Sequence, residues 1–315
     1  MKKNKLTLLG LICLTCTTGC FHTAKNKENN TTTPNKLKKG IVNSPFYEQH
    51  KSTYSNFNKG YNWELIWSEE FNEGKQPNPK IWTYGEGYIR KNAKSYYTIR
   101  PKNIRLEYGC LVIEAHKEQF KNKDYTPNSN DPLKQQFATY TSGRLKTANK
   151  FSFKYGKIDV RAKIQSGSGA WSQLSLINNN ADPARSNWPD CGEILLLAYR
   201  GQHPDTLLTS VFSKNYRWDH SLHYYNPTKE FHIWSVEWSK DQLRFYLDGK
   251  LYNIVNKYKT NGEKIKNWPF NQEFCFYLDL IIGGSWSPAI DDKIFPVKLK
   301  VDYIRIYKDK NNQQD

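Results

Sequence analysis

Alternation between charged and apolar residues is the pattern that most constrains this chain. Positions 157–164 read Lys-Ile-Asp-Val-Arg-Ala-Lys-Ile, so an apolar residue follows each charged one. Successive side chains of a β-strand point to opposite faces of the sheet. The segment is therefore predicted to be a strand with one face in water and the other in a packed core.

The same period of two recurs along the chain from about residue 61. Further predicted strands cover residues 111–116, 170–177, 192–199, 207–212, 233–238, 242–247, 250–255, 274–282 and 300–307. Asp248-Gly249 stands between two of them, and this dipeptide favours a two-residue type I′ hairpin because both positions need a positive φ. With no long amphipathic helix pattern and no internal repeat, we expect one all-β antiparallel sandwich over 61–308, followed by a polar tail at 309–315.

The N-terminal segment has the features of an export signal. Lys2, Lys3 and Lys5 precede an apolar stretch at 6–14 that is too short to span a bilayer, and small residues precede Cys20. The segment resembles a bacterial lipoprotein signal peptide over residues 1–20, although Thr17 replaces the usual leucine. The resemblance implies that Cys20 is lipidated and anchors the protein to the outer membrane or cell surface. An ordinary secretory signal is the alternative.

Residues 21–60 are polar and basic, and we expect them to form a flexible linker. Lys and Arg number 47 against 30 Asp and Glu in the whole chain, a net charge of +17. Ten lysines and two glutamates in the first 60 residues supply +8 of this excess. No nucleic-acid motif accompanies the remaining +9, so nucleic acid is not an expected partner. The sequence identifies no protein partner.

Three cysteines, Cys110, Cys191 and Cys275, remain after the predicted signal. An odd number excludes a complete disulfide framework. Buried free thiols are expected, with one disulfide left open. No spacing of Cys and His indicates a zinc site.

Several segments in order carry a family resemblance. They read WELIWSEEFN at 63–72, YYTIRPKNIRLEYGCLVIEA at 96–115, YTSGRLKTANKFSFKYGKIDVRAKI at 140–164, GGSWSP at 283–288 and VDYIRIY at 301–307. Residues 61–308 thereby resemble glycoside hydrolase family 16, most closely its laminarinase-like β-1,3-glucanases. The resemblance implies a concanavalin A-like β-jelly-roll sandwich with a concave glycan-binding cleft.

The segment WPDCGEILLLAYRG at 188–201 departs from the family pattern W-P-x-C-G-E-I-D-I-M-E-Y. By resemblance, Glu193 holds the position of the nucleophile. Leu195 replaces the assisting aspartate and Ala198 replaces the acid/base glutamate. A retaining glycosidase needs two carboxylates about 5 Å apart, one to attack and one to protonate the leaving oxygen. Ala198 can do neither, and apolar Leu195 is expected to raise the pKa of Glu193 by desolvation.

Other family positions have changed as well. Ala93 stands at the glutamate of the family's N-N-E-L-Q-Y-Y, Ser175 stands at the second tryptophan of G-x-W-P-A-F-W, and Phe212 aligns with a histidine often found near the acid/base. Several independent losses in one site predict that Glu193 is not an active nucleophile.

The residues that remain suit glycan capture. Tryptophan rings stack on the apolar faces of sugars while polar groups bond the hydroxyls. The resemblance assigns six residues to substrate binding, for each tryptophan of which core packing is the alternative: Trp171, Trp188, Trp286, Asn92, Arg100 and Glu193.

A structural calcium ion is the only cofactor that the resemblance suggests. Some family members bind calcium at positions matched here by Glu70 and Asp302, and oxygen ligands suit this ion. Ordinary exposed acids are the alternative, and no cofactor is required for the expected function.

The first hypothesis is a surface lipoprotein that binds a polysaccharide, a β-1,3-glucan, on a catalytically disabled hydrolase scaffold. The second is an active glycoside hydrolase or transglycosylase with a substitute general acid, for which Asp182, Asp190 and Asp219 are candidates. The third is an adhesive or structural surface protein that binds no glycan.

Overall fold

The computed structural model describes residues 61–90, 92–179 and 188–311. The predicted signal peptide with Cys20 and the predicted linker lie outside these residues. Among the described residues, strands and two short 3-10 helices form the regular structure, and there is no α-helix. No helix in this part of the chain is long and apolar enough to cross a bilayer. The 3-10 helices are η1 (Pro132–Lys134) and η2 (Asp292–Ile294).

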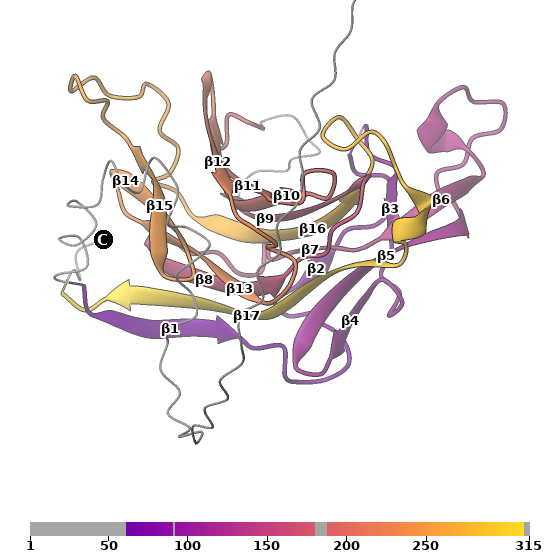
Figure 1. The fold of residues 1–315 in the computed structure, drawn as a ribbon, viewed down its shortest axis with the longest axis horizontal. Helices are drawn as coiled ribbons and strands as arrows, with labels where there is room; N and C mark the ends of the chain where they lie inside the picture. The colour runs from indigo at the N-terminus through magenta and orange to yellow at the C-terminus, as the bar shows by residue number, and fades with distance from the viewer. Residues whose placement is uncertain (1–60, 91, 180–187, 312–315) are drawn as a thin grey trace, which may run out of the picture. The chain divides into compact units, whose positions relative to one another are not determined.

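Two sheets form the fold (Figure 1). The ten-stranded sheet runs in the order β15 (Lys250–Asn256), β14 (Gln242–Leu247), β13 (His232–Trp238), β8 (Gly156–Lys163), β17 (Val297–Asp309), β5 (Cys110–Lys121), β6 (Phe137–Ser142) and β3 (Ser95–Tyr97), with β1 (Trp63–Glu69) beside β17 and β4 (Ile104–Glu107) beside β5. The seven-stranded sheet runs in the order β12 (Tyr216–His223), β11 (Thr206–Ser213), β10 (Glu193–Arg200), β9 (Ala170–Asn178), β16 (Phe274–Ile282), β7 (Arg144–Lys146) and β2 (Thr83–Tyr84).

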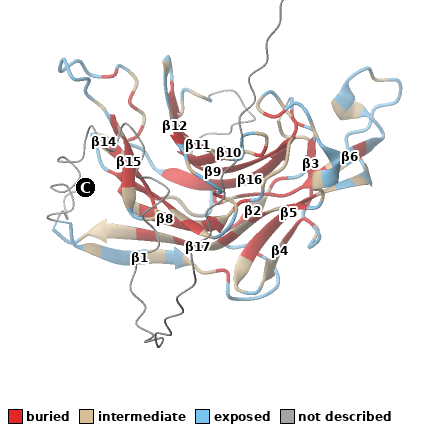
Figure 2. Ribbon diagram, viewed as in Figure 1, coloured by how far each residue is buried: buried red, intermediate tan, exposed pale blue. Residues whose placement is uncertain are grey.

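The core lies between the two sheets. Figure 2 shows buried residues along the strands of both layers and exposed residues on β1 and in the loops. Trp234 on one sheet and Phe276 on the other belong to the same buried cluster and are each 1% exposed. Burying an aromatic or aliphatic side chain of this kind contributes about 1.5–3 kcal/mol. Aromatic residues thus supply much of the core, and the predicted all-β sandwich is confirmed.

Strand β8 confirms the predicted alternation. Ile158, Val160 and Ala162 are at most 1% exposed, whereas Lys157 and Arg161 are half-buried on the opposite face. The pattern places β8 in the middle of the ten-stranded sheet, between β13 and β17.

The hairpin at Asp248-Gly249 is also confirmed. Leu247 pairs with Lys250 at the end of β14 and β15, so two residues make the turn. Asp248 has φ +49 and Gly249 has φ +74, as a type I′ turn requires.

The last strand, β17, continues to Asp309, one residue into the predicted polar tail. Its final residues pair with β1, and Asp309 is opposite Trp63. The edge strand therefore orders the chain slightly beyond 308.

The three cysteines of the domain are free thiols. Ile177 on β9 is paired with Glu193 on one side and with Cys275 on the other. Cys191 nevertheless packs against the apolar cluster that contains Cys275, and both thiols are free in this structure.

Candidate glycan-binding cleft

The cleft lies on the outer face of the seven-stranded sheet. On β9, Leu174 and Leu176 point into the core between the sheets. Trp171 and Gln173 alternate with them and line the opposite, cleft side. Period-two geometry thus gives one strand both a core face and a site face.

A β-bulge determines which residues of β10 face the cleft. Ile194, Leu196 and Leu197 all belong to the core cluster, although the last two are adjacent in sequence. The pairing with β9 shifts between Leu195 and Leu197, as a bulge requires. Because of this shift, Ala198 joins Leu195 in a separate apolar cluster. The motif positions held by Glu193, Leu195 and Ala198 are unevenly spaced in sequence. The bulge nevertheless brings all three to the same face of the sheet, the face that carries the cleft.

Gly192 fits the backbone just before this strand. Its φ is +92, and a Cβ atom there would come within 2.6 Å of Pro269. Only glycine avoids both the strain and the clash. Gly192 thereby fixes the point at which Glu193 enters the sheet.

The cleft has a volume of about 500 Å³. Its described lining is both aromatic and cationic, and consists of Ile89, Arg90, Asn92, Ala93, Arg144, Trp171, Gln173, Ile177, Trp188, Glu193, Leu195, Phe212, Arg217, Gly284, Ser285 and Trp286. Five of the six predicted binding residues are in this list, since Arg100 is absent from it.

Glu193 is buried at the cleft floor, with 4% of its surface exposed. Gln173 Nε2 donates to Oε1 at 2.7 Å and Trp188 Nε1 donates to Oε2 at 2.7 Å. Burial raises the pKa of Glu193 above its usual value, although the nearby Arg90 charge and the hydrogen bond from Trp188 act in the opposite direction. Both oxygens are thus already engaged, and the carboxylate is disfavoured in its charged form.

Apolar side chains occupy the two positions at which the family resemblance predicts carboxylates. Leu195, Ala198 and Phe212 are 2%, 0% and 6% exposed and pack together with Leu208 and Trp286. No described acid is next to Ala198 in the sheet, because its neighbours across the strands are Gln173 and Leu208. The predicted loss of the acid/base is therefore accompanied by repacking of its surroundings.

Trp171 and Trp286 form an aromatic pair, with ring centroids 5.2 Å apart. Trp171 is 8% exposed, and its Nε1 donates to Gly283 O at 3.0 Å. Trp286 is half-buried and also contacts the apolar cluster. Trp171 combines core packing with cleft lining, whereas Trp286 retains free surface for a ligand.

Trp188 lies at the mouth of the cleft with 43% of its surface exposed. Its ring centroid is 5.5 Å from that of Phe212 and its nitrogen is bonded to Glu193. An exposed ring that is held in place on one edge is suited to stacking on a sugar.

Asn92 and Ala93 approach the cleft from the opposite rim. Ala93 makes an isolated bridge with Gly283 and is 3% exposed, packed with Trp171 and Ile281. Asn92 is exposed at the lining. The glutamate that the family pattern would place at 93 is thus replaced by another small apolar contact.

Two arginines and a buried acid at the cleft were missed by the sequence reasoning. Arg90 Nη2 contacts Asp279 Oδ2 at 3.0 Å and Gln173 Oε1 at 2.9 Å, and Arg144 Nε lies 3.3 Å from Asp279 Oδ1. Asp279 is fully buried. The Arg90 guanidinium also lies 5.3 Å from the Trp171 ring. The pairing of β16 with β7 places Asp279 opposite Arg144. Knowledge of this strand register would have been needed to predict the cluster.

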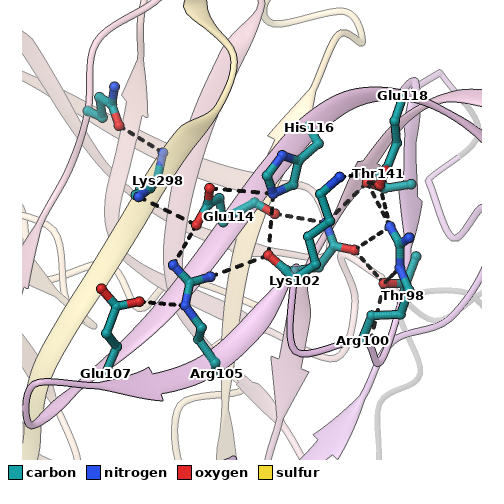
Figure 3. A network of polar contacts seen from close by, with 12 residues as sticks. Thr98, Arg100, Lys102, Arg105, Glu107, Glu114, His116, Glu118, Thr141 and Lys298 are labelled. Atoms are coloured by element: carbon teal, nitrogen blue, oxygen red, sulfur yellow. Dashed lines mark hydrogen bonds and ion pairs between the residues drawn. The ribbon is translucent and has the colours of Figure 1, made fainter.

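The assignment of Arg100 to the cleft was wrong. Figure 3 shows its guanidinium among Glu118, Thr141 and Thr98, in a polar network carried by β5 and β6. Hydrogen bonds from Lys102, Thr141 and Arg100 outweigh the effect of burial and lower the pKa of Glu118 to about 2. Arg100 is therefore committed to an ion pair away from the cleft.

The two predicted calcium ligands are each engaged by an arginine. Arg305 makes two hydrogen bonds to Glu70, at 2.8 and 2.9 Å, and Arg161 contacts Asp302. Within the described residues, no group of three Asp, Glu, His or Cys side chains could hold a metal ion. The residues do not fit a calcium site in this arrangement, and calcium stays a prediction that would require displacement of both arginines.

The two candidate substitute acids that the structure describes, Asp190 and Asp219, do not adjoin Ala198 in the sheet. Asp190 is exposed and 3.7 Å from Lys214 Nζ. Asp219 accepts a hydrogen bond from Ser210 Oγ at 2.6 Å and lies opposite it on β12. Asp182 lies outside the described residues.

Comparisons with known proteins agree with this fold. The sequence profile of glycosyl hydrolases family 16 matches residues 112–305. A β-glucanase from Rhodothermus marinus is 31% identical over 265 residues, which covers 79% of this chain and 87% of the relative. The chain therefore belongs to glycoside hydrolase family 16.

Solved structures place it among laminarinase-like members. The laminarinase catalytic domain of Thermotoga maritima superposes with a TM-score of 0.69 at 34% identity, covering 79% of this chain and 100% of that domain. A structure from a study of endo-acting O-glycanases of the human gut microbiota has a TM-score of 0.70 at 32% identity, covering 80% of this chain and 93% of that one. The jelly-roll prediction is confirmed.

Proposed function

We propose that this protein binds a polysaccharide, a β-1,3-glucan in the first instance, in a cleft that no longer hydrolyses it. The observation that carries the proposal is the apolar cluster of Leu195, Ala198 and Phe212 beside Glu193. Hydrolysis with retention needs a second carboxylate there. The cluster supplies no proton donor and no base.

The expected loss of rate is large. General acid–base catalysis contributes about 10²–10⁴-fold, and a sugar alkoxide is a poor leaving group without it. Glu193 is also weakened as a nucleophile, because burial raises its pKa and both of its oxygens accept hydrogen bonds. Both halves of the family mechanism are thus impaired.

The remaining surfaces of the cleft are suited to binding. Trp188 and Trp286 offer partly exposed rings on which the apolar faces of a glucose unit can stack. Asn92 and Ser285 line the rim with groups that can bond hydroxyls. The naming of relatives as β-glucanase and laminarinase supports a β-glucan as the polymer class.

Affinity electrophoresis tests this proposal. The domain from about residue 61 should be retarded in a gel that contains laminarin, and the same protein should release no reducing ends from laminarin over several days. Trp286→Ala should be retarded much less than the unmodified domain at the same laminarin concentration. Release of oligosaccharides by the unmodified domain would contradict the proposal, as would normal migration.

An active hydrolase or transglycosylase is the second candidate. The retention of Glu193 at the cleft floor and the similarity to glucanases favour it. It requires a substitute acid such as Asp190, whose exposed side chain would have to approach the cleft. Activity that is abolished by Glu193→Gln and by Asp190→Asn would support this candidate over the binding proposal.

We propose further that Cys20 carries a lipid that holds the cleft at the cell surface. The basic n-region, the short apolar stretch and the cysteine support this reading. In a bacterial host, Cys20→Ala should transfer the protein from the membrane fraction to the soluble fraction. Unchanged fractionation would contradict lipidation at this residue.

A further inference from the structure

Arg217 holds an unusual position at the cleft. It lies on the edge strand β12, is exposed, and faces the cleft together with Phe212, its partner on β11. Its guanidinium carbon is 5.1 Å from the centroid of the Phe212 ring and 5.9 Å from that of Trp286. A guanidinium over two aromatic rings is held in a defined orientation while it keeps its charge.

The hydrogen bonds of Arg217 use only part of its donors. Nε contacts the two Asp219 oxygens at 2.9 and 2.7 Å. Within the described residues, no hydrogen bond is formed by Nη1 or Nη2. These two nitrogens form the fork that binds a carboxylate or a sulfate with two parallel hydrogen bonds.

The other two cleft arginines are less exposed than Arg217. Arg90 and Arg144 both contact the buried carboxylate of Asp279. They share this one carboxylate, whereas Arg217 pairs with Asp219, so exposure and not charge balance distinguishes Arg217. Of the three arginines that line the cleft, Arg217 is the most exposed and presents its free fork to the ligand.

Two described carboxylates bear on an anion at Arg217. Asp219 pairs with Nε and offsets part of the Arg217 charge, but leaves the Nη fork open. Glu193 is the only carboxylate in the described cleft lining. Glu193 is two strands away, since Phe212 of β11 stands between them in the sheet. Two strand spacings are about 9.6 Å, too far for Glu193 to contact an anion held at Arg217. Moreover, Gln173 and Trp188 donate to Glu193 and shield it.

We propose that the cleft selects an anionic polysaccharide, with a sugar ring on Trp286 and the sulfate or carboxylate of that chain on the free fork of Arg217. This inference rests on the proposed function and narrows it to a class of ligand. The apolar cluster beside Arg217 strengthens the contact, because hydrogen bonds between charged groups gain from a less polar surrounding.

Three polymers with one backbone provide the test: laminarin, laminarin sulfate, and laminarin oxidised at C6 to carry carboxylates. Affinities are measured by isothermal titration calorimetry at about 0.15 M salt. At least one charged polymer should bind about tenfold or more tightly than laminarin, in line with a bidentate charged contact. The sulfate and carboxylate arms identify which group the natural chain carries.

Arg217→Gln should bring the ratio of charged to neutral affinity to within about threefold of one, and Arg217→Lys should retain an intermediate ratio because a point charge replaces the fork. Arg161→Gln is the matched control. Arg161 also pairs with an aspartate, Asp302, and lies 4.6 Å from an aromatic ring, that of Phe231, but on the ten-stranded sheet. Its removal changes the net charge equally and should leave the ratio as it was. Thermal unfolding of each variant checks that it is folded.

Three results would overturn the inference, each in a distinct way. Equal affinity for neutral and charged laminarin would refute it and leave the proposed function intact. An equal loss of the ratio in Arg161→Gln would show general attraction to a basic protein. Failure of all three polymers to bind the unmodified protein would refute the proposed function itself.

Discussion

The Trp188 indole nitrogen donates a 2.7 Å hydrogen bond to Oε2 of Glu193. The carboxylate at the family's nucleophile position therefore holds an exposed aromatic ring at the mouth of the cleft. This contact joins the predicted nucleophile position to the ring proposed to stack on sugars, and it gives Glu193 a positioning role in the proposed function.

Glu193→Gln should weaken laminarin binding about threefold to tenfold. Glutamine can still accept from Trp188 or Gln173 through its single carbonyl oxygen, but it cannot accept from both as a carboxylate does. The variant should also show increased mobility of the Trp188 ring, measured by fluorescence anisotropy decay. Unaltered binding together with unaltered ring mobility would contradict the positioning role.

The stability of the unmodified domain should fall as pH rises through the raised pKa of Glu193. Burial raises this pKa above its unfolded value, so the folded state binds more protons than the unfolded state between the two values. Stability from this group is thus fully present below the unfolded pKa and is lost as pH rises through the folded pKa. Urea unfolding from pH 4 upward should show a decrease that Glu193→Gln lacks. The same decrease in both proteins would assign the effect to another group.

Trp286→Ala should lower the affinity for laminarin by about 5–30-fold, which corresponds to about 1–2 kcal/mol of lost stacking. Trp218→Ala is the control. Trp218 is 44% exposed on β12, but its Nε1 faces Asn253 of the other sheet, at 3.4 Å. Calorimetry should find that this control binds as the unmodified domain does, and an equal loss in both variants would argue against a specific platform.

Asp279→Asn should destabilise the domain strongly. Asp279 is fully buried between Arg90 and Arg144, and removal of one partner of a buried ion pair costs about 3–5 kcal/mol. For a domain of this size, each kcal/mol lowers Tm by about 2–4 °C. Scanning calorimetry should therefore show a fall of roughly 6–20 °C. Asp219→Asn removes an exposed partner and should cost less than about 1 kcal/mol; a similar fall in both would contradict the account.

Leu195→Asp combined with Ala198→Glu should restore slow release of reducing ends from laminarin. The bulge of β10 already turns both positions to the cleft, so the new carboxylates would enter it beside Glu193. Ala198→Glu alone should be slower because Leu195 would still desolvate the site. A stable double variant that binds laminarin and releases nothing would show that the cleft no longer positions the glycosidic bond.

The sequence predicted much of the fold because its strongest strands are those with the clearest alternation. Strand β8 and the Asp248-Gly249 hairpin follow from period and turn chemistry alone. By contrast, β12 was missed. It reads Tyr-Arg-Trp-Asp-His-Ser-Leu-His and is largely exposed at a sheet edge, so it has no apolar face to reveal it.

The site was predicted only in part, because sequence motifs do not reveal contacts between distant strands. The motif around Glu193 identified Leu195 and Ala198, but not that Phe212 and Trp286 close over them. That contact depends on strands far apart in sequence. The prediction for Arg100 was wrong because the resemblance indicates only the segment in which a residue lies. The direction of the Arg100 side chain is set by its ion pair with Glu118 on β5. Arg217 could be found only after β12 was placed beside β11.

The central claim is that the cleft holds a glucan without cutting it. Its most direct test is to incubate laminarihexaose with an excess of the domain in ¹⁸O-water for several days and to follow both binding and mass. The account predicts a bound, intact hexasaccharide with no shorter or longer products and no ¹⁸O at a new reducing end. Shortened products that carry ¹⁸O would demonstrate hydrolysis, and longer ones would demonstrate transglycosylation; either would contradict the account.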